Sequence, residues 1–278
     1  MRVLAVGAAG QFAGLVVPEL VRRGVTVRGM VHKPEDVKVA LSLGATEVVV
    51  GELNDTESVK SALAGMEGVF YIAPAFLRSE GEVGKRFVQS ASEAGVRRFV
   101  FSSVIHPILS ELSNHAAKAP VEEALIDSGM QWVFLQPAMF FQNIGAAWEK
   151  ASMTGIYAEP WSNDTRFTRV DFRDVAEVAA LAMTEDSLLY GTFELCSDGN
   201  LDRHNLTALM SEVMGRLVVP AKAQIPPAAG LPPELTRMFD WYDKHSLLGN
   251  ALTLRAILGR EPRTLRSYLE DLNSKSSR

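Results

Sequence analysis

The sequence predicts an α/β fold, in which a doubly wound parallel sheet with helices on both faces is followed by a smaller lobe of mixed structure. Three observations favour this fold class. The first 36 residues follow the order strand, glycine-rich turn, helix, strand. The same alternation of strand and helix continues to about residue 135. The strands also read as continuous apolar runs, such as residues 69–73, which is typical of parallel strands buried on both faces.

The first turn of the chain carries the earliest functional signal. An apolar strand over residues 3–6 leads into Gly7-Ala8-Ala9-Gly10, and apolar residues recur at helical spacing from Leu15 onward. Glycines at positions 7 and 10 permit a tight turn, and the N–H groups at a helix start attract an anion. We therefore expect the pyrophosphate of a dinucleotide here, as in a Rossmann fold. The alternative is a glycine turn with a purely structural role.

The remaining elements divide the chain into two domains. After the first strand, further core strands are expected at residues 25–31, 46–50, 69–73, 99–102 and 131–135. Later elements are strands near residues 167–170 and 192–196 and helices over 205–215 and 234–272. Asn54 and Glu57 have the spacing of a capping box at a helix start. The expected domains are a dinucleotide-binding core over residues 1–135 and a substrate lobe over 136–278, from which a segment at about 165–185 returns to the core.

Composition excludes several classes of protein. With 278 residues, of which 47% are hydrophobic and 22% charged, the chain is long and apolar enough for a globular core. Its net charge of −5 provides no broad basic surface, so we expect no direct nucleic-acid partner. No apolar run approaches the ~20 residues that span a bilayer, and the first strand follows Met1 directly, without a signal peptide. A single cysteine, Cys196, suits a reducing compartment. These features predict a cytoplasmic protein without a membrane partner.

Several short motifs together resemble one family. Besides the first turn, they are Gly51-Glu52-Leu53-x-Asp55, Phe99-Val100-Phe101-Ser102-Ser103, Lys118 with Glu122, the loop from Gln136-Pro137 to Asn143, and Val170-Asp171-x-x-Asp174-Val175-Ala176. In order and spacing the chain resembles the NmrA-like atypical short-chain dehydrogenases over about residues 1–215. That family also holds quinone reductases and redox-sensing regulators. The resemblance implies a nicotinamide dinucleotide cofactor.

The resemblance also implies where the cofactor lies. The pyrophosphate would be held by Gly7, Ala9, Gly10, Gln11 and Phe12. Leu53 would contact the adenine, and the inner ribose would be bordered by Ala73, Pro74 and Ala75. Ser102 follows a core strand at its carboxyl end, where open α/β sheets bind ligands, and the alternative role for this serine is turn chemistry.

The residues after the second strand bear on the choice between NADP and NAD. An acidic residue there would accept hydrogen bonds from the ribose hydroxyls and select NAD. This chain has His32-Lys33 instead, and a cationic pair attracts a 2′-phosphate, so NADP is favoured over NAD. The alternative is that Lys33 is only solvated and His32 packs on the adenine edge.

The reacting end departs from the usual Tyr-x-x-x-Lys pair of short-chain dehydrogenases. Lys118 stands at the position of the lysine and would contact the nicotinamide ribose. The alternative is a surface lysine. Asn114 stands where the tyrosine would be, and an amide cannot donate the proton. Pro120 also disfavours a helix through both positions, so a helix start near Ala119 is expected. His115 or His106 could replace the tyrosine as the acid; the alternative for each is a loop histidine bonded to water or backbone.

Aromatic residues supply the expected acceptor site. A quinone ring could stack against such side chains, with Asn143 beside them, and the alternative for each aromatic residue is core packing; the candidates are Phe76, Phe140, Phe141, Trp148 and Trp161. We expect no metal site, because the five histidines include no i, i+4 pair. Leu247, Leu248, Leu252 and Leu254 could serve either a core or a homodimer interface.

Two functions follow from these features. The first is an NADP-binding oxidoreductase that transfers hydride to a small apolar or aromatic acceptor such as a quinone, without proton donation from a tyrosine. The second is a non-catalytic NADP(H) redox sensor that acts through a regulatory protein partner. A sugar-nucleotide epimerase shares the fold but needs the absent tyrosine.

Overall fold

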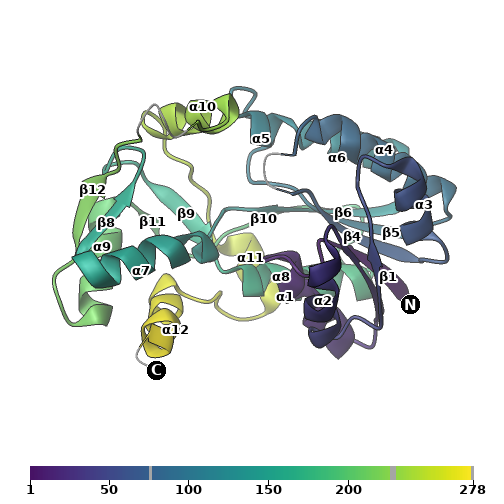
Figure 1. Cartoon of the computed structure of the whole chain (residues 1–278), viewed down its shortest axis with the longest axis horizontal. Helices are drawn as coiled ribbons and strands as arrows, with labels where there is room; N and C mark the ends of the chain where they lie inside the picture. Colours follow the sequence, from purple (N-terminus) through teal and green to yellow (C-terminus); the bar gives the residue numbers. More distant parts are fainter. Residues whose placement is uncertain (75–76, 226–229, 277–278) are drawn as a thin grey trace. The chain divides into compact units, whose positions relative to one another are not determined.

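The computed structural model describes residues 1–74, 77–225 and 230–276. The chain forms two compact units. Unit 1 consists of residues 1–110, 114–136 and 175–193, and unit 2 consists of residues 111–113, 137–174 and 194–278. Figure 1 shows the elements of both units, coloured from the purple N-terminus to the yellow C-terminus.

A seven-stranded sheet forms the centre of unit 1. Its strands are β1 (Arg2–Val6), β2 (Thr26–Val31), β3 (Glu47–Val50), β4 (Gly68–Ile72), β5 (Arg98–Ser102), β6 (Gln131–Pro137) and β10 (Thr192–Leu195). The strand order is β10-β6-β5-β4-β1-β2-β3, and the pairings from β3 through β6 are parallel. The chain therefore starts in the middle of the sheet, builds outward to β3 and then crosses over β1 to begin the other half at β4. This doubly wound α/β sheet confirms the predicted fold class.

Helices alternate with these strands along the chain, as the sequence predicts. They are α1 (Ala13–Arg22), η1 (Pro34–Asp36), α2 (Val37–Ser42), α3 (Thr56–Leu63), α4 (Glu80–Glu93), α5 (Ser113–Ala116), α6 (Ala119–Asp127) and α8 (Phe172–Thr184). The capping prediction was wrong by one residue: the carboxylate of Asp55, not the amide of Asn54, accepts the N–H of Glu57 at the start of α3.

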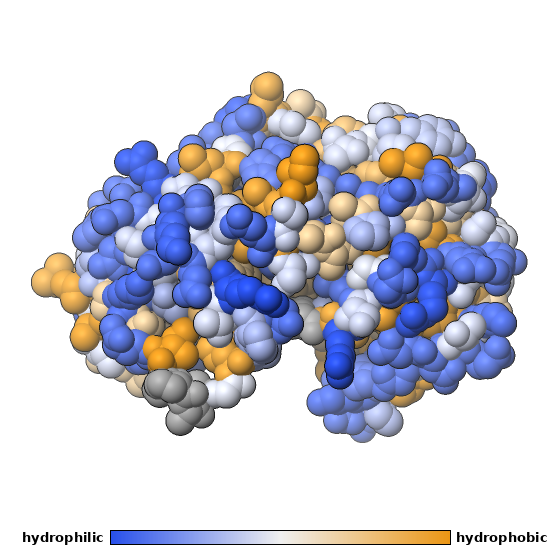
Figure 2. All heavy atoms as spheres, turned by 90° about the horizontal axis from the view of Figure 1, so that it is seen from above, coloured by the Kyte–Doolittle hydropathy of each residue, from blue (hydrophilic) through white to orange (hydrophobic). Residues whose placement is uncertain are grey.

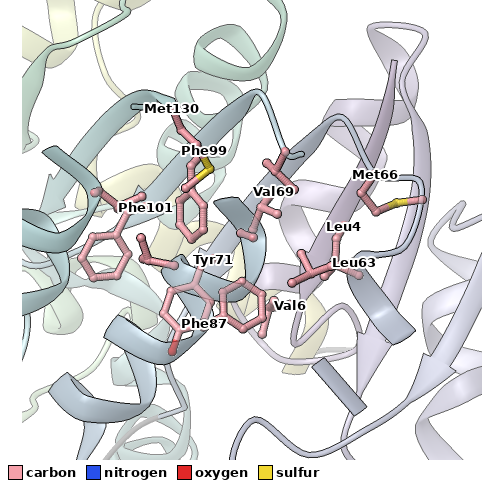
Figure 3. Close-up of a cluster of buried hydrophobic side chains, with 14 of the residues drawn as sticks. Leu4, Val6, Leu63, Met66, Val69, Tyr71, Phe87, Phe99, Phe101 and Met130 are labelled. Atoms are coloured by element: carbon pink, nitrogen blue, oxygen red, sulfur yellow. The ribbon is translucent and has the colours of Figure 1, made fainter. Parts of the chain in front are cut away.

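The core of unit 1 is rich in aromatic residues. Tyr71 on β4 lies 4.8 Å from Phe87 on α4 between ring centroids, and Phe99 and Phe101 on β5 are each within about 6 Å of Tyr71. Figure 3 shows these rings in one buried cluster with Leu4, Val6 and Leu63 from neighbouring elements. Burying this apolar surface on one side of the sheet fixes β4 and β5 and, with them, the residues at their carboxyl ends.

The described part of unit 2 contains two small sheets and five further α-helices. Its strands are β7 (Met139–Phe140), β8 (Ile156–Glu159), β9 (Phe167–Val170), β11 (Asn200–Leu201) and β12 (Val219–Lys222), paired in the orders β11-β9-β7 and β12-β8. Its helical segments are η2 (Phe141–Ile144), α7 (Gly145–Thr154), α9 (Arg203–Met214), α10 (Pro233–Tyr242), α11 (Leu252–Leu258) and α12 (Leu265–Ser276). A second core packs around the fully buried Trp148 and Tyr157. Both parallel and antiparallel pairs occur, so the prediction of a mixed lobe is confirmed.

Hydrophobic and hydrophilic residues are interspersed on the face of the molecule that Figure 2 shows. The most exposed large apolar side chains are Ile108, Met153, Leu217 and Leu252. Within the described ranges, no helix has the length and apolarity to cross a membrane.

Candidate functional site

The turn after β1 has the geometry of a tight glycine turn. Gly7 adopts a φ of +72°, a conformation that L side chains rarely adopt, and its N–H donates to the Met30 carbonyl at 2.9 Å. The N–H of Gly10 donates to the Gly7 carbonyl at 2.7 Å. A Cβ at position 10 would lie only 3.1 Å from that same carbonyl oxygen. Both glycines are thus required by the turn itself.

The turn brings the start of α1 to the carboxyl end of β1. The first turn of α1 contains no acidic residue, so its N-terminal partial positive charge is available to an anionic ligand. Close packing holds the loop in place, because a Cβ on Gly29 of β2 would lie 2.9 Å from the Cβ of Ala8. The neighbouring Ala13 is buried where α1 begins.

The position of the turn in the sheet is that of a nucleotide site. In the order β3-β2-β1-β4-β5-β6, the direction of winding reverses between β1 and β4. Open α/β sheets bind ligands beyond the carboxyl ends of the strands at such a switch point, and this strand order is the one of dinucleotide-binding folds. The glycine turn follows β1 directly, so its backbone lies at the expected place for a pyrophosphate.

The end of β2 is polar and carries no acidic residue. His32 and Lys33 are both exposed, and His32 Nδ1 lies 2.9 Å from Glu52 Oε1. Lys33 has no ion pair with any described residue. The Glu52 carboxylate, which sequence reasoning did not foresee, partly offsets a charge on His32. Lys33 therefore remains the cation that could meet a 2′-phosphate.

Two hydroxyl groups lie at the carboxyl end of β5 without hydrogen-bond partners. Ser102 is 1% and Ser103 is 6% exposed, and the Oγ atoms of both are buried and make no hydrogen bond within the described protein. The backbone of Ser103 is anchored, since its N–H donates to the Leu135 carbonyl at 2.8 Å. Buried hydroxyls without partners are uncommon, so these two are available to a ligand at the same edge of the sheet.

Lys118 is buried and forms an ion pair with the carboxylate of Glu80. Close packing of α4 against α6 brings the two side chains together (Figure 1). A Cβ on Gly84 would lie 2.4 Å from Val121 Cγ2, and one on Gly81 would lie 3.3 Å from the Ala117 carbonyl oxygen. Sequence reasoning missed Glu80, although two glycines three residues apart at the start of a helix signal a close helix crossing.

The segment before Lys118 does not form one continuous helix. Helix α5 ends at Ala116 and α6 begins at Ala119, with Pro120 in its first turn. The predicted helix start near Ala119 is confirmed. Asn114 and Lys118 therefore do not share a single helix in the manner of a Tyr-x-x-x-Lys pair.

His115 is buried, with Nδ1 lying 3.2 Å from the His106 carbonyl oxygen. Burial in apolar surroundings lowers the pKa of His115 to about 4, so its imidazole is neutral at pH 7. The structure therefore does not support His115 as a charged acid near neutral pH. A histidine bonded to the backbone, the alternative that the sequence left open, matches its hydrogen bond.

The other residues expected at the cofactor are distributed around the same edge of the sheet. Leu53 and Ala73 are partly buried and pack against the core of unit 1, whereas Pro74 is exposed. Ala75 and Phe76 lie outside the described residues. Gln11 and Phe12 belong to the turn before α1.

The residues expected at the acceptor have different environments in unit 2. Phe140 is partly buried and meets the Phe172 ring edge-to-face at 4.9 Å, and Asn143 is exposed. Phe141 is 1% exposed and packs at 5.7 Å on Tyr268, so it belongs to the core. Trp148 and Trp161 are also buried, which matches the alternative of core packing.

The remaining motif residues form hydrogen bonds with neighbouring elements. Gln136 donates from Nε2 to Glu122 Oε1 at 2.9 Å within unit 1. In unit 2, Gln142 bridges Asp171 and the backbone of Phe172 at 2.8 and 3.0 Å. Salt bridges with Arg173 lower the pKa of Asp171 despite its burial. These hydrogen bonds give the polar motif residues a structural role and do not indicate a catalytic one.

The fold and the glycine turn at the switch point define a Rossmann-like protein of the dinucleotide-binding class. The sequence model of the NmrA-like family matches residues 1–269, so the chain belongs to that family.

Among its curated relatives is the NAD(P)H azoreductase of Xenophilus azovorans, 24% identical over an alignment of 225 residues, with 78% of this chain and 75% of the relative covered. Quinone oxidoreductase 2 of Escherichia coli K12 is 23% identical over 278 aligned residues, with 96% of each chain covered. Among solved structures, the triphenylmethane reductase of Citrobacter sp. complexed with NADP(H) superposes with a TM-score of 0.85 at 20% identity, covering 98% of this chain and all of that one.

Proposed function

We propose that the protein is an NADP-dependent reductase that transfers hydride to a small apolar or aromatic acceptor such as a quinone. The observation that carries the proposal is the strand order β3-β2-β1-β4-β5-β6 with the glycine turn at its switch point. The relatives support the same class of chemistry, because those named above are reductases of azo compounds, quinones or triphenylmethane dyes by name.

The residues at the edge of the sheet fit a nicotinamide dinucleotide. The turn from Gly7 to Phe12 and the start of α1 would hold the pyrophosphate. The partnerless hydroxyls of Ser102 and Ser103 offer hydrogen bonds that the protein itself does not use. Lys118, fixed by Glu80, would contact the nicotinamide ribose. When bound, the cofactor supplies the hydride.

The charge at the end of β2 supports NADP as the cofactor. The two residues directly after β2 are His32 and Lys33 rather than a carboxylate that would accept hydrogen bonds from the adenosine ribose, and Lys33 is exposed beside the expected position of a 2′-phosphate. His32 is engaged by Glu52, so Lys33 is the better candidate for the phosphate. A lysine binds phosphate as a point charge. We therefore expect tighter binding of NADP than of NAD, without complete exclusion of NAD.

The proposed reaction needs no tyrosine. Asn114 cannot donate a proton, and His115 is neutral and bonded to the backbone. Tyr71 is fully buried and does not reach solvent, and burial raises the pKa of its hydroxyl well above the usual range. A quinone accepts hydride readily and its product can take a proton from water. The lack of a proton donor among these side chains therefore favours such acceptors and does not prevent turnover.

Steady-state oxidation of NADPH with a panel of quinones, azo dyes and aldehydes tests the proposal. We expect turnover with quinones and little or none with aldehydes, because the alkoxide formed from an aldehyde depends on a positioned proton donor, whereas the hydroquinone anion can take its proton from water. Tight NADP binding without turnover of any acceptor would instead favour the redox sensor, which the substitution of asparagine for tyrosine at position 114 also permits.

A further inference from the structure

Two arginines are buried next to one another in unit 2. Arg169, on β9, is 4% exposed, and Arg203, at the start of α9, is 2% exposed. Both guanidinium groups lie beside the same carboxylate oxygen, Glu159 Oε2, at 3.8 Å from Arg169 Nη2 and 3.4 Å from Arg203 Nε. Segments 34 residues apart in the sequence thus place two positive charges around one negative charge in the interior of this unit.

The hydrogen bonds of these arginines are incomplete. Arg203 Nη1 donates to the Trp161 and Ala221 carbonyls at 2.9 and 3.0 Å, but its Nη2 is buried and has no acceptor. Arg169 Nε and Nη1 are also buried and have no acceptor among the described residues. A guanidinium presents five donors and is always charged, and native proteins rarely bury such donors without acceptors.

Among the described residues, no second carboxylate pairs with these arginines. Tyr157 already donates to the other oxygen of Glu159 at 3.0 Å. The neighbouring acids Asp243 and Asp164 lie at the surface and pair with Lys222 and His204. The buried cluster of Arg169, Arg203 and Glu159 therefore carries a net charge of +1.

The surroundings of this excess positive charge are aromatic. The Arg169 guanidinium lies 5.4 Å from the centroid of the Phe167 ring, and that of Arg203 lies 5.9 Å from the Trp161 ring. Aromatic walls exclude water and lower the local dielectric constant, so an anion in this place would be attracted more strongly than at the surface. Ser197, whose N–H donates to the Arg169 carbonyl at 2.8 Å, adds a buried hydroxyl without a partner.

We propose that Arg169 and Arg203 form an oxyanion-binding site in unit 2, which takes a carboxylate, sulfonate or phosphate group. The oxygens of such a group supply the acceptors that the three guanidinium nitrogens lack and neutralise the excess charge. The anion site does not depend on the proposed reductase function.

Calorimetric titration of the whole protein at low ionic strength tests the site without NADPH or turnover. The probes are inorganic sulfate, naphthalene-2-sulfonate and its neutral analogue naphthalene-2-sulfonamide. We expect saturable binding of at least one anion and none of the sulfonamide. Tighter binding of the sulfonate than of sulfate assigns the site to the acidic group of a larger ligand, and the reverse assigns it to a free anion.

Two variants separate a binding role from a structural one. Arg169→Met should weaken anion binding by about tenfold or more, as expected for the loss of a charge-assisted hydrogen bond. Arg237→Met, which removes an exposed arginine of the same unit that pairs with Glu234, should leave it unchanged. The thermal midpoint of Arg169→Met in anion-free buffer should be no lower than that of the wild type, because the substitution removes a buried charge without hydrogen bonds.

Wild-type protein that binds neither anion would overturn the proposal, whether or not the variant folds. Undiminished anion binding by Arg169→Met would overturn it as well. A reductase that turns over neutral quinones while binding no anion would refute this site and leave the proposed function intact.

Discussion

Lys118 in unit 1 and Arg169 in unit 2 are both buried cations, but the protein treats them differently. Lys118 is paired with the carboxylate of Glu80 at a close crossing of two helices. Arg169 is 3.8 Å from a carboxylate that it shares with Arg203, and two of its nitrogens make no hydrogen bond. A buried charge with a partner of its own holds a structure in place. A buried charge that shares its partner and keeps donors without acceptors points to a ligand.

His115 shows a third way for a basic group to be buried. No carboxylate of the described residues pairs with it. Its burial lowers the pKa to about 4, so the imidazole is neutral at pH 7. An arginine cannot do this, because its guanidinium remains protonated in proteins. The comparison therefore predicts different responses of these three groups to substitution and to pH.

The largest effect is expected from breaking the Lys118–Glu80 pair. Lys118→Met leaves the Glu80 carboxylate buried without its partner and should lower the free energy of unfolding by about 3–5 kcal/mol. Urea denaturation measures the loss. Lys85→Met, which removes an exposed partner of Glu82 on the same helix, should remain close to the wild type. The double variant Lys118→Met/Glu80→Gln should recover part of the loss. Equal stability of Lys118→Met and Lys85→Met would contradict the role given to burial.

The next effect concerns pH. In the unfolded chain His115 takes up a proton below its ordinary pKa of 6.5, whereas in the folded protein it does so only near pH 4. The unfolded state therefore binds more protons in this window, so stability falls as the pH falls from 6.5 to 4, by roughly 3 kcal/mol in total.

Urea denaturation at pH 7.5, 5.5 and 4.5 measures this dependence, with His115→Gln as the variant that removes the titrating group. The variant should lose a large share of the acid sensitivity between pH 6.5 and 4. An unchanged pH profile in the variant would mean that His115 is not the buried neutral base that the structure shows.

Local patterns made much of unit 1 predictable. The glycine turn, the strands and the break before Ala119 depend on residues within a few positions of one another, such as Pro120 in the first turn of α6. The strand order could be predicted only as a class, since the crossover from β3 to β4 follows from packing over the whole sheet. The sequence predicts Asn54 as the cap of α3, but the structure has Asp55 in this role, because both adjacent residues are good cap residues.

Contacts between distant residues were not predictable. Glu80 and Lys118 are 38 residues apart, and Arg169 and Arg203 belong to different elements of unit 2. The short strands β8 and β12 also went unforeseen, because Val219–Lys222 is no more apolar than a loop and becomes a strand only by pairing with Ile156–Glu159. The sequence made Phe141 a candidate ligand-binding residue with core packing as the alternative, and in the structure it is a core residue.

The central claim is that the protein binds NADP with Lys33 at the 2′-phosphate. Its most direct test is a calorimetric titration of the wild type, Lys33→Ala and Lys38→Ala with NADP and with NAD. Lys38 is an exposed lysine on α2 and serves as the matched control. We predict that the wild type binds NADP more tightly than NAD, and that Lys33→Ala alone weakens NADP binding by about tenfold, the loss of one phosphate ion pair, with NAD binding unchanged. Equal affinity of the wild type for both cofactors, or NADP binding undiminished in Lys33→Ala, would contradict the account.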